Sequence, residues 1–177
     1  MTAVGAFGSA CVAALLAVIA CGESRPAVDT RMGAPQYDYL RDDAERLVAF
    51  LRGEAVLDSG AVADSVTLHI APEGGGEWKR VSADQLGDSA AWRIGGYSLL
   101  PPPGLTTVTI RPGRHINCLE TSLGSRYPQL ESRPHVGVRL SGADPASCLQ
   151  TWNMTFVFSE DVERPRLTDV VYDQWEW

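Results

Sequence analysis

Three histidines and two aspartates are the side chains best suited to acid–base chemistry: His69, His115, His135, Asp169 and Asp173. Such chemistry needs two groups within hydrogen-bond reach of each other and with suitably shifted pKa values. On one strand the two aspartates would be about 13 Å apart, too far for a carboxylate pair. Each histidine is more simply interpreted as an exposed or hydrogen-bonded structural residue. We therefore predict no catalytic residue.

The motifs of common enzyme classes are missing from the sequence. It contains neither the Gly-x-Ser-x-Gly turn of serine hydrolases nor the His-Glu-x-x-His helix of metalloproteases. The run Gly74-Gly75-Gly76 lacks the lysine and serine of a phosphate-binding loop, so it indicates a hairpin or a flexible loop. We expect no metal and no cofactor. The prediction is a non-catalytic binding or accessory module, and the alternative is a small hydrolase or isomerase with a histidine-containing pocket.

Aromatic side chains late in the sequence are candidates for contact with a ligand or a partner. Tryptophan and tyrosine are common at binding hot spots, where they stack on sugars or fill pockets. The simpler interpretation of the same residues is core packing on a β-hairpin. The candidate ligand or partner contacts are these aromatic residues and two of the histidines: His69, His135, Trp152, Tyr172, Trp175 and Trp177.

The four cysteines agree with export to an oxidising compartment, where one disulfide is the simple inference. Cys11 and Cys21 belong to an apolar N-terminal segment, which leaves Cys118 and Cys148 as an even pair. A disulfide between them would close a loop of about 30 residues and stabilise the fold by roughly 3–4 kcal/mol. A buried pair of free thiols is the alternative. A lone His115-x-x-Cys118 pattern is weak evidence for zinc.

The N-terminal segment has no charged residue before Glu23 and ends in Val18-Ile19-Ala20-Cys21. This ending resembles the lipobox of bacterial lipoproteins, whose signal peptide is cleaved before an invariant cysteine. The resemblance implies that residues 1–21 are signal peptide and lipobox. It also implies that Cys21 carries acyl chains such as palmitate, which anchor the protein in the cell envelope. Gly22, where some lipoproteins have aspartate, favours the outer membrane over the periplasmic face of the inner membrane.

Two other interpretations of the N-terminus stay open. About 20 apolar residues span a bilayer as a helix, so residues 1–20 could form an uncleaved anchor for a structural subunit of a membrane complex. Alternatively, the segment is an ordinary cleaved signal and Cys21 is a free thiol.

Charge and composition limit the partners. The chain has 177 residues, with 15 lysines and arginines against 22 acidic residues and a net charge of -7. Nucleic-acid binding needs a basic surface, and no segment supplies one, so we expect no nucleic-acid partner. The expected partners are the membrane and a protein at the envelope.

The remaining sequence predicts a tether over residues 22–35 and one domain over 36–177. Apolar residues with helical spacing predict a helix over about 36–53. A capping-box pattern predicts one helical turn over 82–86. Alternating or apolar runs predict strands over 65–71, 77–81, 92–100, 105–111, 114–119, 135–140, 149–158 and 167–177.

This element order favours an α+β domain in which one N-terminal helix packs on a mostly antiparallel, curved sheet. A β-sandwich or a small barrel is the alternative. The last two strands are expected to form a long hairpin. In element order, residues 36–177 are similar to the cystatin-like cone of the nuclear transport factor 2-like families. That resemblance implies an open end of the cone where a ligand could bind.

Overall fold

A computed structural model describes residues 35–70, 76–119, 121–142 and 148–173 of the chain. The predicted helix begins as a 3-10 turn, Pro35–Leu40, and continues as α1, Arg41–Leu51. One face of α1 buries Ala44, Leu47, Val48 and Leu51, as their helical spacing predicts. Gly53 follows with a φ of 73°, a left-handed conformation that ends helices at little cost for glycine.

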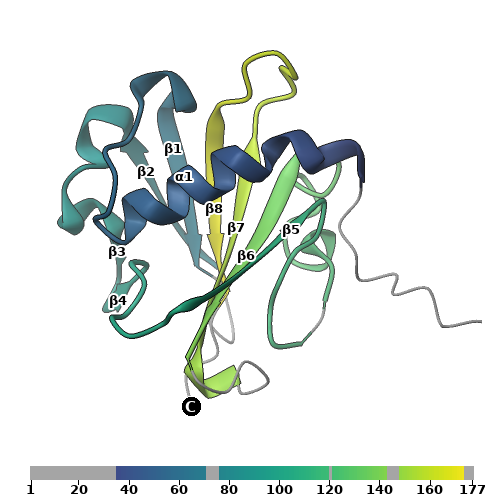
Figure 1. The fold of residues 1–177 in the computed structure, drawn as a ribbon. Coiled ribbons are helices and arrows are strands. Elements are labelled where there is room, and N and C mark those ends of the chain that lie inside the picture. The colour runs from purple at the N-terminus through teal and green to yellow at the C-terminus, as the bar shows by residue number, and fades with distance from the viewer. Residues whose placement is uncertain (1–34, 71–75, 120, 143–147, 174–177) are drawn as a thin grey trace, which may run out of the picture. The chain divides into compact units, whose positions relative to one another are not determined.

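Six strands form an open, curved sheet, and two short strands form a separate pair (Figure 1). The order in the large sheet is β2-β1-β8-β7-β6-β5. All neighbouring strands are antiparallel except β1 and β8, which run parallel. The strands are β1 Val62–Ile70, β2 Glu77–Ser82, β3 Arg93–Ile94, β4 Tyr97–Ser98, β5 Thr107–Pro112, β6 His135–Ser141, β7 Thr151–Phe158 and β8 Leu167–Tyr172.

The fold is therefore α+β, as predicted, and not a closed barrel or a sandwich. The predicted hairpin of the last two strands is confirmed, because β7 and β8 pair antiparallel from Met154 opposite Tyr172 to Phe158 opposite Leu167. The capping box at Ser82 is also confirmed, since Ser82 and Gln85 cap the 3-10 turn between them reciprocally.

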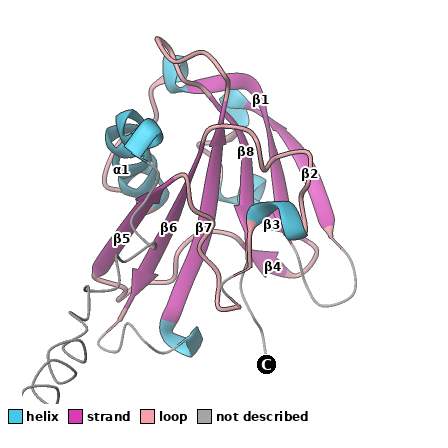
Figure 2. Ribbon diagram, turned by 90° about the vertical axis from the view of Figure 1, so that its right-hand side faces the viewer, coloured by secondary structure: helices cyan, strands magenta, loops and turns pink. Residues whose placement is uncertain are grey.

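The two faces of the sheet have different covers. Helix α1 lies across one face, and Figure 2 shows it standing to one side of the strands. The large core lies on this face and includes Trp152, Phe156 and Phe158 from β7. The opposite face carries a smaller core, in which Leu123, Tyr127 and Leu130 pack on Val157 and Val171. We call residues 113–119 and 121–134, which supply this second cover, the covering segment.

Two predicted strands are wrong. Within 92–100, Gly95 and Gly96 turn the chain back, and Gly95 has a φ of 57°, so two-residue strands β3 and β4 replace one long strand. Residues 114–119 belong to the covering segment and form no strand. There the polar side chains of His115 and Asn117 bond to the sheet beneath, in place of backbone pairing with a neighbouring strand.

The covering segment lies close against Gly137 of β6. A methyl group at this position would collide with the carbonyl oxygen of Arg114 and with Ile116. The predicted disulfide between Cys118 and Cys148 is present, with a Cα–Cα distance of 5.8 Å. It joins the covering segment to the 3-10 turn, Cys148–Gln150, directly before β7.

Candidate functional site

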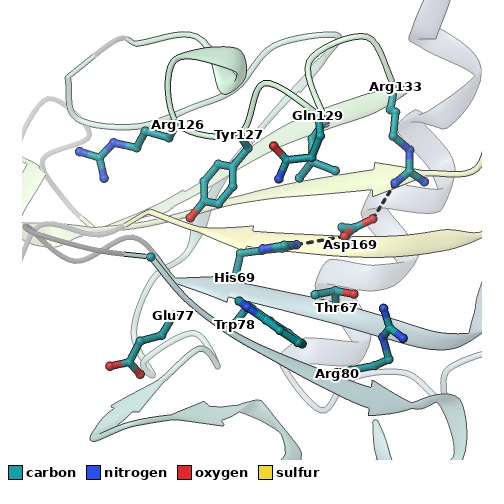
Figure 3. Close-up of a pocket in the computed structure, with 12 residues that line it drawn as sticks. Thr67, His69, Glu77, Trp78, Arg80, Arg126, Tyr127, Gln129, Arg133 and Asp169 are labelled. Carbon is teal, nitrogen blue, oxygen red and sulfur yellow. Dashed lines mark hydrogen bonds and ion pairs between the residues drawn. The ribbon is translucent and has the colours of Figure 1, made fainter.

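A pocket of about 560 Å³ opens between the covering segment and the strands β1 and β2, on the face away from α1 (Figure 3). The covering segment contributes one wall and the strands contribute the other. Most of the lining is polar or aromatic. It consists of Thr67, His69, Gly76, Glu77, Trp78, Arg80, Arg126, Tyr127, Gln129, Leu130, Arg133 and Asp169.

Strand register explains why these side chains meet. His69 pairs with Trp78 across β1 and β2, and Thr67 pairs with Arg80. On the other side of β1, Thr67 is aligned with Asp169 of the parallel strand β8. Side chains alternate between the faces of a strand, so these residues share one face while Val66, Leu68 and Ile70 enter the large core on the other.

A hydrogen-bond network joins His69, Asp169 and Arg133. His69 Nε2 lies 3.0 Å from Asp169 Oδ1. An ionised carboxylate only accepts hydrogen bonds, so this nitrogen carries the proton. Arg133 Nη1 donates to Asp169 Oδ2 at 2.8 Å. The second guanidinium nitrogen, Nη2, donates to Thr168 Oγ1 at 2.6 Å and to the Phe158 carbonyl at 3.2 Å.

The electrostatics of this network keep Asp169 ionised. Burial by itself raises the pKa of the Asp169 carboxyl, but hydrogen bonds from His69 and Thr168 and the positive charge of Arg133 lower it below its usual range. Both carboxylate oxygens already have a partner. Asp169 therefore anchors the pocket wall and has little capacity left to accept a proton from a substrate.

Tyr127 contributes a buried, unsatisfied hydroxyl to the pocket lining. Its ring meets the His69 ring edge-on, with the centroids 5.3 Å apart. Its hydroxyl is buried and has no hydrogen-bond partner among the described residues. Burial and the nearby Asp173 charge raise the pKa of Tyr127 to about 12, outweighing the opposite effect of Arg126, so the hydroxyl stays protonated at neutral pH.

The outer part of the pocket is aromatic and cationic. Trp78 is 66% exposed, and Arg80 two residues further along β2 is also exposed. In the described part of the chain, Arg80 makes no hydrogen bond or ion pair through its side chain. Both are free to meet a molecule that enters from solvent.

A second polar network lies beneath the covering segment, outside the pocket lining. The side chains of His115 and Asp173 are each 2% exposed, and His115 Nε2 lies 3.2 Å from Asp173 Oδ2. His115 Nδ1 is 2.7 Å from Thr155 Oγ1, and Asn117 donates to Asp173 Oδ2 at 3.1 Å. Burial raises the pKa of Asp173, but hydrogen bonds from His115 and Asn117 and the charge of Arg126 together lower it. This network fastens the covering segment to the end of β8.

The five acid–base candidates of the sequence thus separate into two His–Asp pairs and a single histidine. His135 lies outside the pocket lining, with Nδ1 2.8 Å from the Arg133 carbonyl and its ring 6.1 Å from that of Tyr37. Burial lowers the pKa of His135, although the hydrogen bond to Arg133 opposes this effect. The expectation that Asp169 and Asp173 do not form a carboxylate pair agrees with their placement in separate networks.

Two of the aromatic candidates lie in the core and not at a binding surface. Trp152 is 0% exposed, and its indole nitrogen donates to the Leu99 carbonyl at 2.9 Å. Tyr172 is buried beside it, with the ring centroids 6.4 Å apart. Neither side chain is accessible to a ligand here, so the placement corrects that part of the expectation. Cys21, Trp175 and Trp177 lie outside the described residues.

Sequence reasoning missed most of the pocket. Trp78 and Arg80 alternate with Lys79 and Val81 in the predicted strand, so strand periodicity could have placed them beside His69. Tyr127 and Arg133 lie in an irregular segment, where no periodic pattern shows which way a side chain points.

Comparison with known proteins gives no relative: no family model, no curated protein and no solved structure matches the chain significantly. Among the residues that the structure describes, no helix is long and apolar enough to cross a membrane. The same residues contain no cluster of three or more potential metal ligands.

Proposed function

We propose that this protein is a non-catalytic binding module of the bacterial cell envelope, tethered to a membrane through Cys21, and that its ligand occupies the pocket lined by His69 and Trp78. The observation that carries the binding proposal is the combination of a fixed inner wall with an open, unpaired rim. The His69–Asp169–Arg133 network holds the wall in place, and among the residues that the structure describes neither Trp78 nor Arg80 has a side-chain hydrogen-bond or ion-pair partner at the rim. A pocket with these properties binds without first reorganising, which favours affinity.

The chemistry of the lining favours binding over catalysis. The hydroxyl groups among the lining residues belong to Thr67 and Tyr127, and the Tyr127 hydroxyl stays protonated because its pKa is about 12. Neither hydroxyl is hydrogen-bonded to His69 in the described residues. A nucleophile needs an adjacent base within hydrogen-bond reach, and this arrangement is not found in the pocket.

Binding can be tested with the full chain in detergent, labelled with 5-fluorotryptophan. The five tryptophans give separate fluorine signals, and substitution of each assigns them. Small fragments that enter the pocket should shift the Trp78 signal and leave the buried Trp152 signal unchanged. Gln129→Phe, which narrows the pocket, should abolish the shift. Ser132→Phe, exposed on the same segment but outside the lining, is the matched control. If no fragment of a diverse set moves Trp78 saturably, the binding proposal fails.

The tether predicts that Cys21→Ser moves the protein from the membrane fraction to the soluble fraction after export. The reason is that a serine in place of the lipobox cysteine cannot receive acyl chains, and the acyl chains supply the membrane affinity. Fractionation followed by immunoblotting measures this, with Cys11→Ser as the control that should stay at the membrane. Unchanged retention of Cys21→Ser would instead support the uncleaved N-terminal helix, and with it the structural-subunit alternative.

The hydrogen bond between His69 and Asp169 favours a second candidate, a small hydrolase or isomerase. The two candidates differ in the fate of the ligand. A binding module returns its bound ligand chemically unchanged, as mass spectrometry after incubation would show. An enzyme converts it, and His69→Gln would then abolish conversion while leaving the Trp78 shift in place.

A further inference from the structure

We propose that the ligand is a ring compound carrying one carboxylate or phosphate group, with the ring stacked on Trp78 and the anionic group bound by Arg80. This inference rests on the proposed binding function and names the class of ligand.

The pocket face is cationic in a chain whose net charge is -7. Three arginines, Arg80, Arg126 and Arg133, line it against two carboxylates. One of these, Glu77, lies opposite Ile70 in the β1–β2 pair. Its side chain is therefore on the face of β2 that is directed toward the large core. Figure 3 shows its carboxylate directed away from the other labelled side chains. Asp169 is the other, and Arg133 neutralises it at 2.8 Å.

The remaining two arginines differ in availability. Arg126 lies 3.7 Å from Asp173, so the second network already engages its charge. Arg80 has no carboxylate within ion-pair distance in the described residues. A guanidinium group presents paired N–H donors that match the oxygens of a carboxylate or a phosphate. An anionic group of a ligand is therefore the partner that Arg80 lacks.

The aromatic contact lies beside this charge. Trp78 and Arg80 are two residues apart on one face of β2, which separates their Cα atoms by about 7 Å. His69 and Tyr127 extend the aromatic surface behind Trp78 (Figure 3). A ring on the exposed face of Trp78 would thus hold a substituent within reach of the Arg80 guanidinium. Stacking on Trp78 and a charge-assisted hydrogen bond from Arg80 would then act on the same molecule.

Four small probes and inorganic phosphate separate these contributions in ligand-observed titrations of the full chain in detergent. Phenyl phosphate and glucose 6-phosphate carry both the ring and the charge, whereas phenol and glucose carry only the ring. Both anionic rings should bind more tightly than their neutral counterparts and than inorganic phosphate. The tighter of the two shows whether the pocket takes an aromatic or a sugar ring.

Two variants assign the contacts. Arg80→Gln should weaken the anionic rings about tenfold and leave the neutral rings unchanged. The matched control is Arg164→Gln, an exposed arginine outside the pocket lining, which should change nothing. Trp78→Leu should weaken the rings by roughly threefold to tenfold and leave inorganic phosphate unchanged.

The titrations distinguish failure of the anionic-ligand proposal from failure of the binding function. If phenol binds as tightly as phenyl phosphate, or if Arg80→Gln has no effect, the anionic ligand is excluded while the binding function stands. If no probe binds and no fragment shifts the Trp78 signal, the binding function falls as well.

Discussion

At the residue scale, two buried carboxylates link the stability of the fold to pH. Asp169 and Asp173 each bond to a histidine and lie close to an arginine, and in both the folded-state pKa is below the ordinary value of 3.8. A carboxyl group whose pKa falls on folding contributes stability above its unfolded-state pKa. That contribution is lost as the pH falls through the folded-state pKa.

We therefore expect the free energy of unfolding to fall steeply below about pH 4, where the unfolded carboxyl groups begin to bind protons. Urea denaturation between pH 7 and pH 2.5 measures this. Asp169→Asn and Asp173→Asn should each lower the free energy of unfolding at pH 7. Each should also make that free energy fall less steeply as the pH drops toward 2.5. Asp161→Asn, at an exposed turn, is the control in which stability should still fall steeply at low pH. If stability falls with pH as steeply in both aspartate variants as in the wild-type protein, the assignment is wrong.

The unpartnered hydroxyl of Tyr127 gives a second prediction at this scale. Burying a hydroxyl without a hydrogen bond costs roughly 1–3 kcal/mol, so Tyr127→Phe should leave the protein as stable as before or more stable. Tyr127→Ala should cost about 3–5 kcal/mol, because it removes the ring from the small core. Chemical denaturation at pH 7 compares the three proteins. A loss of more than about 1 kcal/mol in Tyr127→Phe, which is the net contribution of one hydrogen bond, would reveal a partner for this hydroxyl.

At the element scale, the covering segment makes the pocket possible by lying directly on the sheet. Gly137→Ala should destabilise the protein by about 1–3 kcal/mol, because the added methyl group overlaps the Arg114 carbonyl and Ile116. Gly142→Ala is the matched control at the end of β6, since its methyl group would make only ordinary contacts. Thermal denaturation followed by circular dichroism compares the two variants. Equal melting temperatures would show that the covering segment is not closely packed against Gly137 of β6.

The elements that the sequence predicts well are those with a clear period. Helix α1 and strands β1, β5, β7 and β8 all carry apolar residues at the spacing of their final structure, and the faces predicted for β7 agree with its packing. The covering segment has no such period. Its position depends on contacts far apart in sequence, such as Arg133 with Asp169 and His115 with Asp173. The pocket was unpredictable for the same reason, because one of its walls is this segment.

At the scale of the whole molecule, the two faces of the sheet have separate roles. The face beneath α1 is filled by the side chains of the large core, such as Trp152, Phe156 and Phe158. The pocket lies on the other face. The resemblance to the nuclear transport factor 2-like families stays a prediction, and the proposed binding site does not depend on it.

The disulfide joins the covering segment to the turn before β7, and both of its cysteines can be replaced together. Replacing Cys118 and Cys148 by serine should lower the free energy of unfolding by roughly 3–4 kcal/mol, because the unfolded chain regains the freedom of a 30-residue loop. Denaturation with and without reductant measures the loss, and the double variant should no longer respond to reductant. If reduction leaves the wild-type protein equally stable, the disulfide contributes nothing to the fold.

The position of β8 affects when the protein can fold. This strand comes last in the chain among those described, yet it lies in the middle of the sheet, between β1 and β7. Until residues 167–172 are available, β2-β1 and β7-β6-β5 have no strand to join them, and the His69–Asp169 network cannot form. A nascent chain therefore cannot complete this sheet until residues 167–172 have been made. For a protein that we propose to be exported, this delay is useful, because a chain that cannot complete its sheet early remains threadable through a narrow translocation channel.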